Sequence, residues 1–178
     1  MMHESYLLLG SNQGNRERNI VKAVKAIAQQ SGNVSKMSSM YRSQPWGFQA
    51  EKDFYNLALL LQTPHEPHAL LHILLEIEKS LGRVRNNKPG YASRTIDIDI
   101  LFYDKLIFES SVLILPHPRI QERRFVLKPL MDLDPEYRHP VSGCSVAYML
   151  AGCEDNSEVE EIKKMENIFN KDNDPHTL

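Results

Sequence analysis

The sequence contains little cysteine and no long apolar run. Its two cysteines, Cys144 and Cys153, cannot build a disulfide framework or a thiolate metal site, and they are typical of free thiols in a reducing compartment. No stretch reaches the roughly 20 apolar residues of a membrane-spanning helix. The apolar run at residues 6–9 is too short for a signal peptide. We therefore expect a cytoplasmic protein that makes no contact with a membrane.

The sequence also lacks an excess of either charge. The 21 basic and 23 acidic residues give a formal net charge of -2, so no whole-chain field would attract nucleic acid. A GxxxxGK[ST] phosphate loop is absent, which excludes a P-loop. With 178 residues, of which 42% are hydrophobic, the chain is typical of one globular domain, and we expect a monomer that binds no nucleic acid.

Apolar periodicity predicts the main elements. Helical spacing predicts helices at 16–30, 67–81 and near 146–150, and extended patterns predict strands at 6–9, 34–42, 54–62 and 93–103. The order strand, helix, strand, strand, helix, strand favours an α+β sandwich with helices on one face of a mainly antiparallel sheet. We assign residues 1–153 to this domain. From Glu154 onward the charged composition predicts a surface helix followed by a frayed tail over 154–178.

The run SRTIDIDILFY at residues 93–103 resembles a buried strand that contains two acids, Asp97 and Asp99. Residues two apart on a strand share a face, so these carboxylates lie side by side while the isoleucines between them line the other face. Adjacent like charges repel, and they need either a cation or open water. Taken alone, the pair is equally consistent with a Mg²⁺ site and with a solvated face.

Basic residues gather on both sides of this run in the sequence: Arg83, Arg85, Lys88 and Arg94 before it, and His117, Arg119, Arg123 and Arg124 after it. The arginine fork suits phosphate oxygens, and metal ions with arginines are the usual groups of phosphoryl transfer. Surface ion pairing would explain any one of these residues, but it explains the whole group less well. The residue types favour phosphate chemistry.

The run DFYN at residues 53–56 predicts a ring-binding face. Phe54 and Asn56 share one strand face, where an aromatic ring could stack on a heterocycle and an amide could read its edge. Phe125 could supply the second stacking ring, and Trp46 lies in a Pro- and Gly-containing loop that could act as a lid. The alternative is that these aromatics are ordinary core residues and that Asn56 satisfies a loop backbone.

Five segments in order, GSNQGNR, DFYN, GRVR, RTIDIDILFY and PHPRIQERRFVLKPL, together resemble the 6-hydroxymethyl-7,8-dihydropterin pyrophosphokinase family of folate biosynthesis, from about residue 6 to 150. The resemblance implies a ferredoxin-like α+β fold. It also implies transfer of the terminal diphosphate of ATP to the hydroxymethyl oxygen of the pterin, with release of AMP.

Matching the motif positions implies a role for each site residue. Two Mg²⁺ ions would be held by Asp97 and Asp99, which with Arg83 and Arg94 form the catalytic set. The resemblance implies that ATP is contacted by Glu78, Arg83, Arg94, Ile100, His117 and Arg123. It implies that the pterin is contacted by Ser43, Gln44, Pro45, Trp46, Phe54, Asn56 and Phe125.

The chain departs from the family pattern in the loop before RTIDID. Tyr91 stands where the family often has tryptophan, and Asn86 stands where some members carry lysine or arginine. Two other functions are weighed against the enzyme. A non-catalytic RNA-binding domain is disfavoured because the RNP1 pattern is missing and the acid pair would repel phosphates without metal. A degenerate binding module is disfavoured by the intact acids and arginines.

Overall fold

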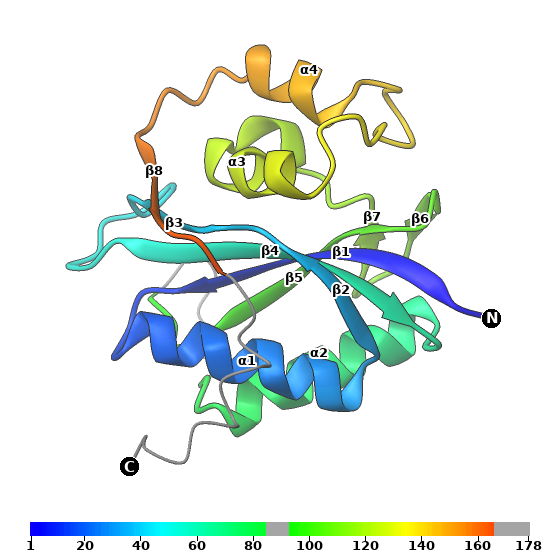
Figure 1. Cartoon of the computed structure of the whole chain (residues 1–178), viewed down its shortest axis with the longest axis horizontal. Coiled ribbons are helices and arrows are strands. Elements are labelled where there is room, and N and C mark those ends of the chain that lie inside the picture. The colour runs from blue at the N-terminus through cyan, green and yellow to red at the C-terminus, as the bar shows by residue number, and fades with distance from the viewer. Residues whose placement is uncertain (85–92, 166–178) are drawn as a thin grey trace.

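The structure, a computed structural model, describes residues 1–84 and 93–165. In these ranges six strands form one antiparallel sheet in the order β5-β1-β4-β3-β8, and β2 also pairs with β4 (Figure 1). They are β1 (His3–Ser11), β2 (Asn33–Met37), β3 (Met40–Ser43), β4 (Phe54–Thr63), β5 (Asp97–Tyr103) and β8 (Val159–Lys163). A separate ribbon pairs β6 (Phe108–Glu109) with β7 (Ile114–Leu115).

Helices cover both faces of the sheet. One face carries α1 (Arg16–Gln30) and α2 (Pro67–Ser80), and the other carries α3 (Arg124–Leu133) and α4 (Val146–Ala151), as Figure 1 shows. The α+β class and the antiparallel sheet are confirmed, but the prediction of a single covered face is wrong. Residues 6–9 of β1 are buried alternately in the two cores, so their apolar run is continuous, as in strands covered on both sides.

Local signals set the first helices. The Asn15 side chain caps α1 by accepting a hydrogen bond from the Arg18 backbone N–H at 3.0 Å. Pro67 occupies the first turn of α2, where its missing N–H leaves no helical bond unmade. The predicted strand at 34–42 is instead divided into β2 and β3, and the apolar segment at 125–130 lies in α3. No helix within residues 1–84 and 93–165 is long and apolar enough to span a bilayer.

The described residues after Glu154 do not form the predicted surface helix. Val159–Lys163 is strand β8, which pairs antiparallel with β3 at the edge of the sheet. Its sequence VEEIK carries charges that suit an edge strand, while Ile162 packs against the core beneath. The prediction is wrong because the charged composition does not reveal the free edge of β3 that this segment covers.

Candidate active site

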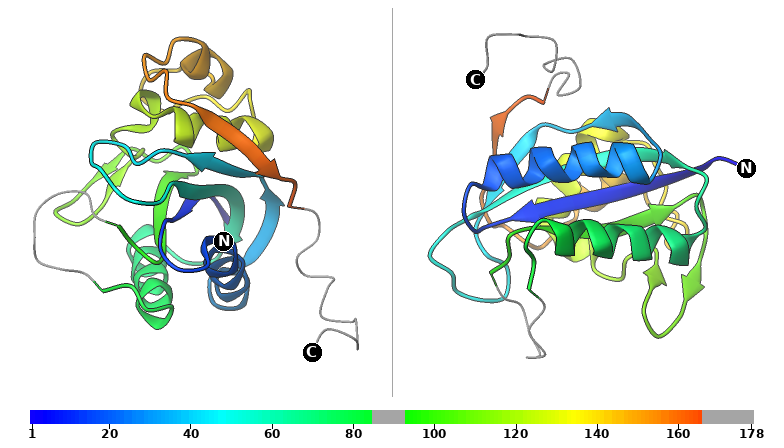
Figure 2. Two further views of the ribbon diagram at one scale, coloured as in Figure 1. Left: turned by 90° about the vertical axis from the view of Figure 1, so that its left-hand side faces the viewer. Right: turned by 90° about the horizontal axis from the view of Figure 1, so that it is seen from below.

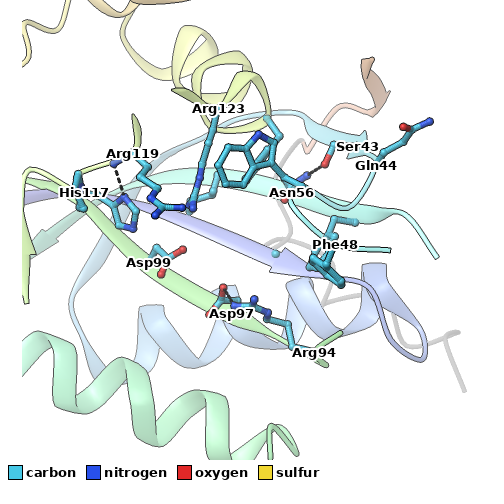
Figure 3. A pocket seen from close by; sticks show the side chains of 16 residues that line it. Ser43, Gln44, Phe48, Asn56, Arg94, Asp97, Asp99, His117, Arg119 and Arg123 are labelled. Carbon is cyan, nitrogen blue, oxygen red and sulfur yellow. Dashed lines mark hydrogen bonds and ion pairs between the residues drawn. The ribbon is translucent and has the colours of Figure 1, made fainter. Parts of the chain in front are cut away.

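The acid pair lies on β5, the edge strand beside β1. Alternation turns Asp97 and Asp99 toward the face that carries α3, whereas Ile98 and Ile100 are buried against α1 and α2 (Figure 3). The predicted division of this strand into an apolar side and an acidic side is confirmed. The strand itself therefore holds the two carboxylates together on a rigid support.

A cavity of ≈ 370 Å³ opens above the acid pair, between the sheet and the start of α3. Most of the residues assigned from the sequence line it: Ser43, Gln44, Trp46, Phe54, Asn56, Arg94, Asp97, Asp99, His117, Arg123 and Phe125. The assigned residues outside its lining are Pro45, Glu78, Arg83 and Ile100. The cavity therefore joins the expected ring-binding residues to the expected phosphate-binding residues in one space of the size that small ligands occupy.

Asp97 is held between two arginines. Arg83 forms an ion pair with one carboxylate oxygen of Asp97, and Arg94 forms an ion pair with the other. Arg83 also contacts the Glu78 carboxylate at 2.6 Å. Burial would lower the pKa of Arg83, but the charges of Asp97 and Glu78 outweigh it and raise the pKa, so the guanidinium stays protonated. Both arginines are thus fixed beside the acid pair.

Glu78 lies beneath the sheet rather than in the cavity. Its side chain is 1% exposed, and its Oε1 accepts a hydrogen bond from the Ile98 backbone N–H at 2.8 Å. A buried carboxylate needs such partners, and Arg83 supplies the positive charge. In this structure Glu78 therefore ties α2 to the backbone of β5 and orients Arg83.

Asp99 carries the electrostatic cost of the pair. Burial and the neighbouring Asp97 carboxylate raise its pKa to about 7, although Arg94 acts in the opposite direction. A cation bound at this place would relieve the repulsion and favour the ionised form of Asp99. Asp99 would therefore gain from a cation bound between the two carboxylates.

His117 is a neutral imidazole with a defined hydrogen-bond direction. Burial and the nearby Arg123 lower its pKa to about 4. Its Nδ1 accepts a hydrogen bond from the Arg119 backbone N–H at 3.3 Å (Figure 3). An imidazole whose Nδ1 accepts carries its proton on Nε2, so His117 presents a neutral donor. Such a donor suits a phosphate oxygen.

Asn56 sits in the middle of the ring-binding side. It is 2% exposed, and its Nδ2 donates a hydrogen bond to Ser43 Oγ at 2.8 Å. Gly10 on β1 lies between Asn56 and Asp97 in the strand register, and a Cβ added there would be 3.4 Å from Asn56 Oδ1. The absence of a side chain at Gly10 leaves room for a flat ring beside the amide.

Trp46 and Arg123 join the two sides of the cavity. The Arg123 guanidinium carbon lies 4.7 Å from the centre of the Trp46 ring and 5.8 Å from that of Phe125. These distances are within the range of cation–π contacts. The loop after β3 therefore touches the start of α3 across the cavity, as Figure 3 shows for Arg123.

Several cavity-lining residues had been assigned no role: Leu8, Gly10, Phe48, Pro118 and Arg119. Arg119 belongs to the PHPR run and to the basic group, so the sequence contained its signal. Gly10 belongs to GSNQGNR, but its place between Asn56 and Asp97 depends on strand order. Phe48, whose ring centre is 6.1 Å from that of Phe54, had no sequence signal. Asn86 and Tyr91 lie outside the described residues.

The residues present fit a Mg²⁺ site that is completed by water and substrate phosphates better than a metal site made of protein ligands alone. Within residues 1–84 and 93–165, no group of three or more His, Cys, Asp or Glu side chains could hold a metal ion. Mg²⁺ keeps several waters and commonly takes one or two carboxylates together with substrate phosphates. Asp97 and Asp99, with arginines beside them, match that pattern.

Taken together, the fold and the site define an α+β protein in which an acid–arginine cluster adjoins an aromatic, amide-containing pocket. The fold matches that of the solved Plasmodium falciparum HPPK-DHPS with a TM-score of 0.70 at 15% identity, over 85% of this chain and 45% of that one. In sequence, residues 6–135 match the family model described as 7,8-dihydro-6-hydroxymethylpterin-pyrophosphokinase (HPPK). The chain belongs to this family.

Named relatives agree with this membership. The 2-amino-4-hydroxy-6-hydroxymethyldihydropteridine pyrophosphokinase of Methylorubrum extorquens is 38% identical over 91% of this chain and 100% of its own length. The folic acid synthesis protein of Pneumocystis carinii is 45% identical over 80% of this chain. The chain spans only 19% of that longer relative.

Proposed function

We propose that the chain transfers the diphosphate of ATP to the hydroxymethyl group of 6-hydroxymethyl-7,8-dihydropterin, releases AMP, and acts in folate biosynthesis. The family match and the names of the relatives support this reaction. The observation that carries the proposal is the shared cavity: Asp97 and Asp99 line the same space as Phe54, Asn56 and Phe125. A phosphate donor and a ring-bearing alcohol could therefore meet there.

The ring-binding side would orient the pterin. Phe54 and Phe125 would stack on its two faces, and the Asn56 amide would read its edge while Ser43 holds that amide in place. Ser43 ends β3, and Gln44, Pro45 and Trp46 belong to the loop that follows. The ring-binding side of the cavity would thereby place the hydroxymethyl oxygen of the pterin near Asp97 and Asp99.

The charged side would hold the nucleotide. Arg94, Arg123 and His117 would contact phosphate oxygens, and Arg83 would assist from below through Asp97. The roles of Glu78 at the adenine and of Ile100 at ATP rest on the family resemblance alone and stay predictions, because neither side chain lines the cavity. Asp97 and Asp99 would bind two Mg²⁺ ions, which neutralise phosphate charge when present.

In the proposed reaction the hydroxymethyl oxygen forms a bond to the β-phosphorus of ATP and gives up its proton to water. The bond from that phosphorus to the oxygen bridging the α- and β-phosphates breaks, and AMP leaves with that oxygen. Positioning and charge stabilisation account for most of the catalysis of such a transfer, and the reaction needs little proton transfer by the protein.

The expectation that the protein is a cytoplasmic monomer stays a prediction.

Separating the nucleotide products by chromatography tests the proposal. Purified protein with ATP and Mg²⁺ should form AMP only when 6-hydroxymethyl-7,8-dihydropterin is added, and a chelator should stop the reaction. Formation of ADP would contradict diphosphate transfer while leaving a kinase. Pterin-independent ATP hydrolysis would contradict the pterin as acceptor.

A further inference from the structure

The described residues after Glu154 touch both walls of the cavity. One wall is the end of β3 and the loop that follows, with Ser43 and Trp46; the other is the start of α3, with Arg123 and Phe125. Figure 2 (left view) shows β8 at the edge of the sheet, on the side of the molecule where α3 and α4 lie, and β8 pairs there with β3. This segment lies beyond residues 6–135, which match the family model.

Asp155 caps the N-terminus of α3, although it lies 31 residues after Arg124 in the sequence. The N-cap residue of α3, Arg123, makes no side-chain capping bond of its own. Instead, Asp155 Oδ2 accepts a hydrogen bond from the Arg124 backbone N–H at 3.0 Å. Burial works against it, but hydrogen bonds from Ser157 and Arg124 lower the pKa of Asp155, so an anion lies at the positive end of the helix. The first turn of α3, which bears Phe125, is anchored to this carboxylate.

Strand β8 fixes the opposite wall. It pairs with β3 so that Val159 is opposite Ser43 and Glu160 is opposite Arg42, and Glu160 forms an ion pair with Arg42. Ser43 is the last residue of β3 and accepts the Asn56 hydrogen bond. Pairing on both sides therefore holds the point from which the loop with Trp46 departs.

We infer that Asp155 and β8 position the ring-binding subsite: residues 155–160 set the distance between the Trp46 loop and the start of α3. Asp155 and Glu160 are thus positioning residues that act through Phe125, Arg123 and Ser43. The inference rests on the proposed function for its ligand, but the geometry can be measured without one. Trp46 is the only tryptophan in the chain, and it contacts Arg123.

The first experiment compares Asp155→Ala, Asp155→Asn and Glu154→Ala in the full chain. Glu154 is the exposed acid next in sequence, so its variant controls for loss of charge. In the ligand-free protein, Asp155→Ala should shift Trp46 emission to longer wavelength and increase its quenching by acrylamide. The same variant should raise KM for the pterin about fivefold, because a cap of ordinary strength is lost from the wall that bears Phe125.

The conservative variant separates positioning from a general loss of stability. Asp155→Asn keeps an oxygen acceptor and should fall between Asp155→Ala and wild type in both measurements. If Asp155→Ala only lowers the melting temperature, with Trp46 emission and pterin KM equal to those of Glu154→Ala, the inference is overturned. If the wild type does not turn over the pterin, the proposed function fails, and the fluorescence comparison still decides the positioning role.

A second pair of variants keeps the test decisive if Asp155→Ala does not fold. Glu160→Lys replaces the partner of Arg42 by a second positive charge, next to Ser43 on the β3–β8 pair. Glu161→Lys makes the same substitution opposite Tyr41 and serves as the control. Glu160→Lys should raise pterin KM about two- to threefold more than its control, as expected for an exposed ion pair. Equal effects of the two variants would count against β8 as a positioning strand.

Discussion

Ile98 and Asp99 are neighbours on β5, yet they lie in different environments. Ile98 is 3% exposed and packs in the core with α1 and α2, whereas Asp99 lines the cavity and shares it with Asp97 and Arg94. The apolar face is satisfied by packing alone. On the acidic face, burial and the neighbouring carboxylate raise the pKa of Asp99, while Arg83 and Arg94 form ion pairs with Asp97. Stability and activity should therefore respond separately to changes on the two faces.

The largest expected effect is on the acidic face. Asp97→Ala and Asp99→Ala should each lower kcat by about a thousandfold or more, because the proposed metal ligands and the position of Arg94 are lost. Thermal unfolding should change little in Asp99→Ala, which removes like-charge repulsion, and more in Asp97→Ala, which breaks the ion pairs with Arg83 and Arg94. Near-normal turnover with Mg²⁺ in both variants would contradict the metal site. It would also contradict the view that the acidic face of β5 serves activity and the apolar face serves stability.

On the apolar face, Ile98→Ala should lower the free energy of unfolding by about 3 kcal/mol, because a cavity opens in a well-packed core. At a temperature where the variant is fully folded, its kcat should stay near that of the wild type. Urea unfolding and steady-state kinetics measure the two quantities. A large kcat loss without a stability loss would show that the faces are not separable.

His117 offers a test by pH. Its pKa in the folded state, about 4, is below the ordinary 6.5, so the unfolded chain takes up a proton first as the pH falls. This contribution to stability is present above pH 6.5 and is lost as the pH falls toward 4. Between pH 7 and 5 the wild type should lose about 1–2 kcal/mol more than His117→Asn. Equal losses in urea unfolding would contradict a buried neutral imidazole.

Among the residues that line the acid pair and its strand, the smallest expected effect comes from Gly10. Gly10→Ala would place a methyl group 3.4 Å from Asn56 Oδ1 and 3.6 Å from the Phe54 ring, in space proposed for the pterin. We expect pterin KM to rise about tenfold, with KM for ATP and the melting temperature nearly unchanged. A rise confined to ATP would instead place the nucleotide beside Gly10.

Local sequence predicted those parts of the site in which neighbouring residues carry the information. The alternation of isoleucine and aspartate over residues 96–100 specifies two faces without reference to the rest of the chain. Apolar spacing predicts helices at 16–30 and 67–81, and the structure has them at Arg16–Gln30 and Pro67–Ser80. Their prediction needed no knowledge of which strand pairs with which.

Predictions failed where distant segments meet. The covering of both sheet faces by helices does not follow from the apolar run at residues 6–9, because that run does not reveal what packs on each side of the strand. The prediction of a surface helix after Glu154 fails because strand β8 depends on its partner β3, which lies more than a hundred residues earlier in the chain. Glu78 and Arg83 could be named, but their bonds to Ile98 and Asp97 depend on how α2 packs beneath β5.

The sequence by itself determined the residue types of the site, their order and their side of each strand, because side-chain alternation is a local property. Only the tertiary structure decided that Gly10 separates Asn56 from Asp97, that Arg123 reaches Trp46, and that Asp155 caps α3. Strand order and helix docking depend on burial summed over the whole chain, so no single segment encodes them.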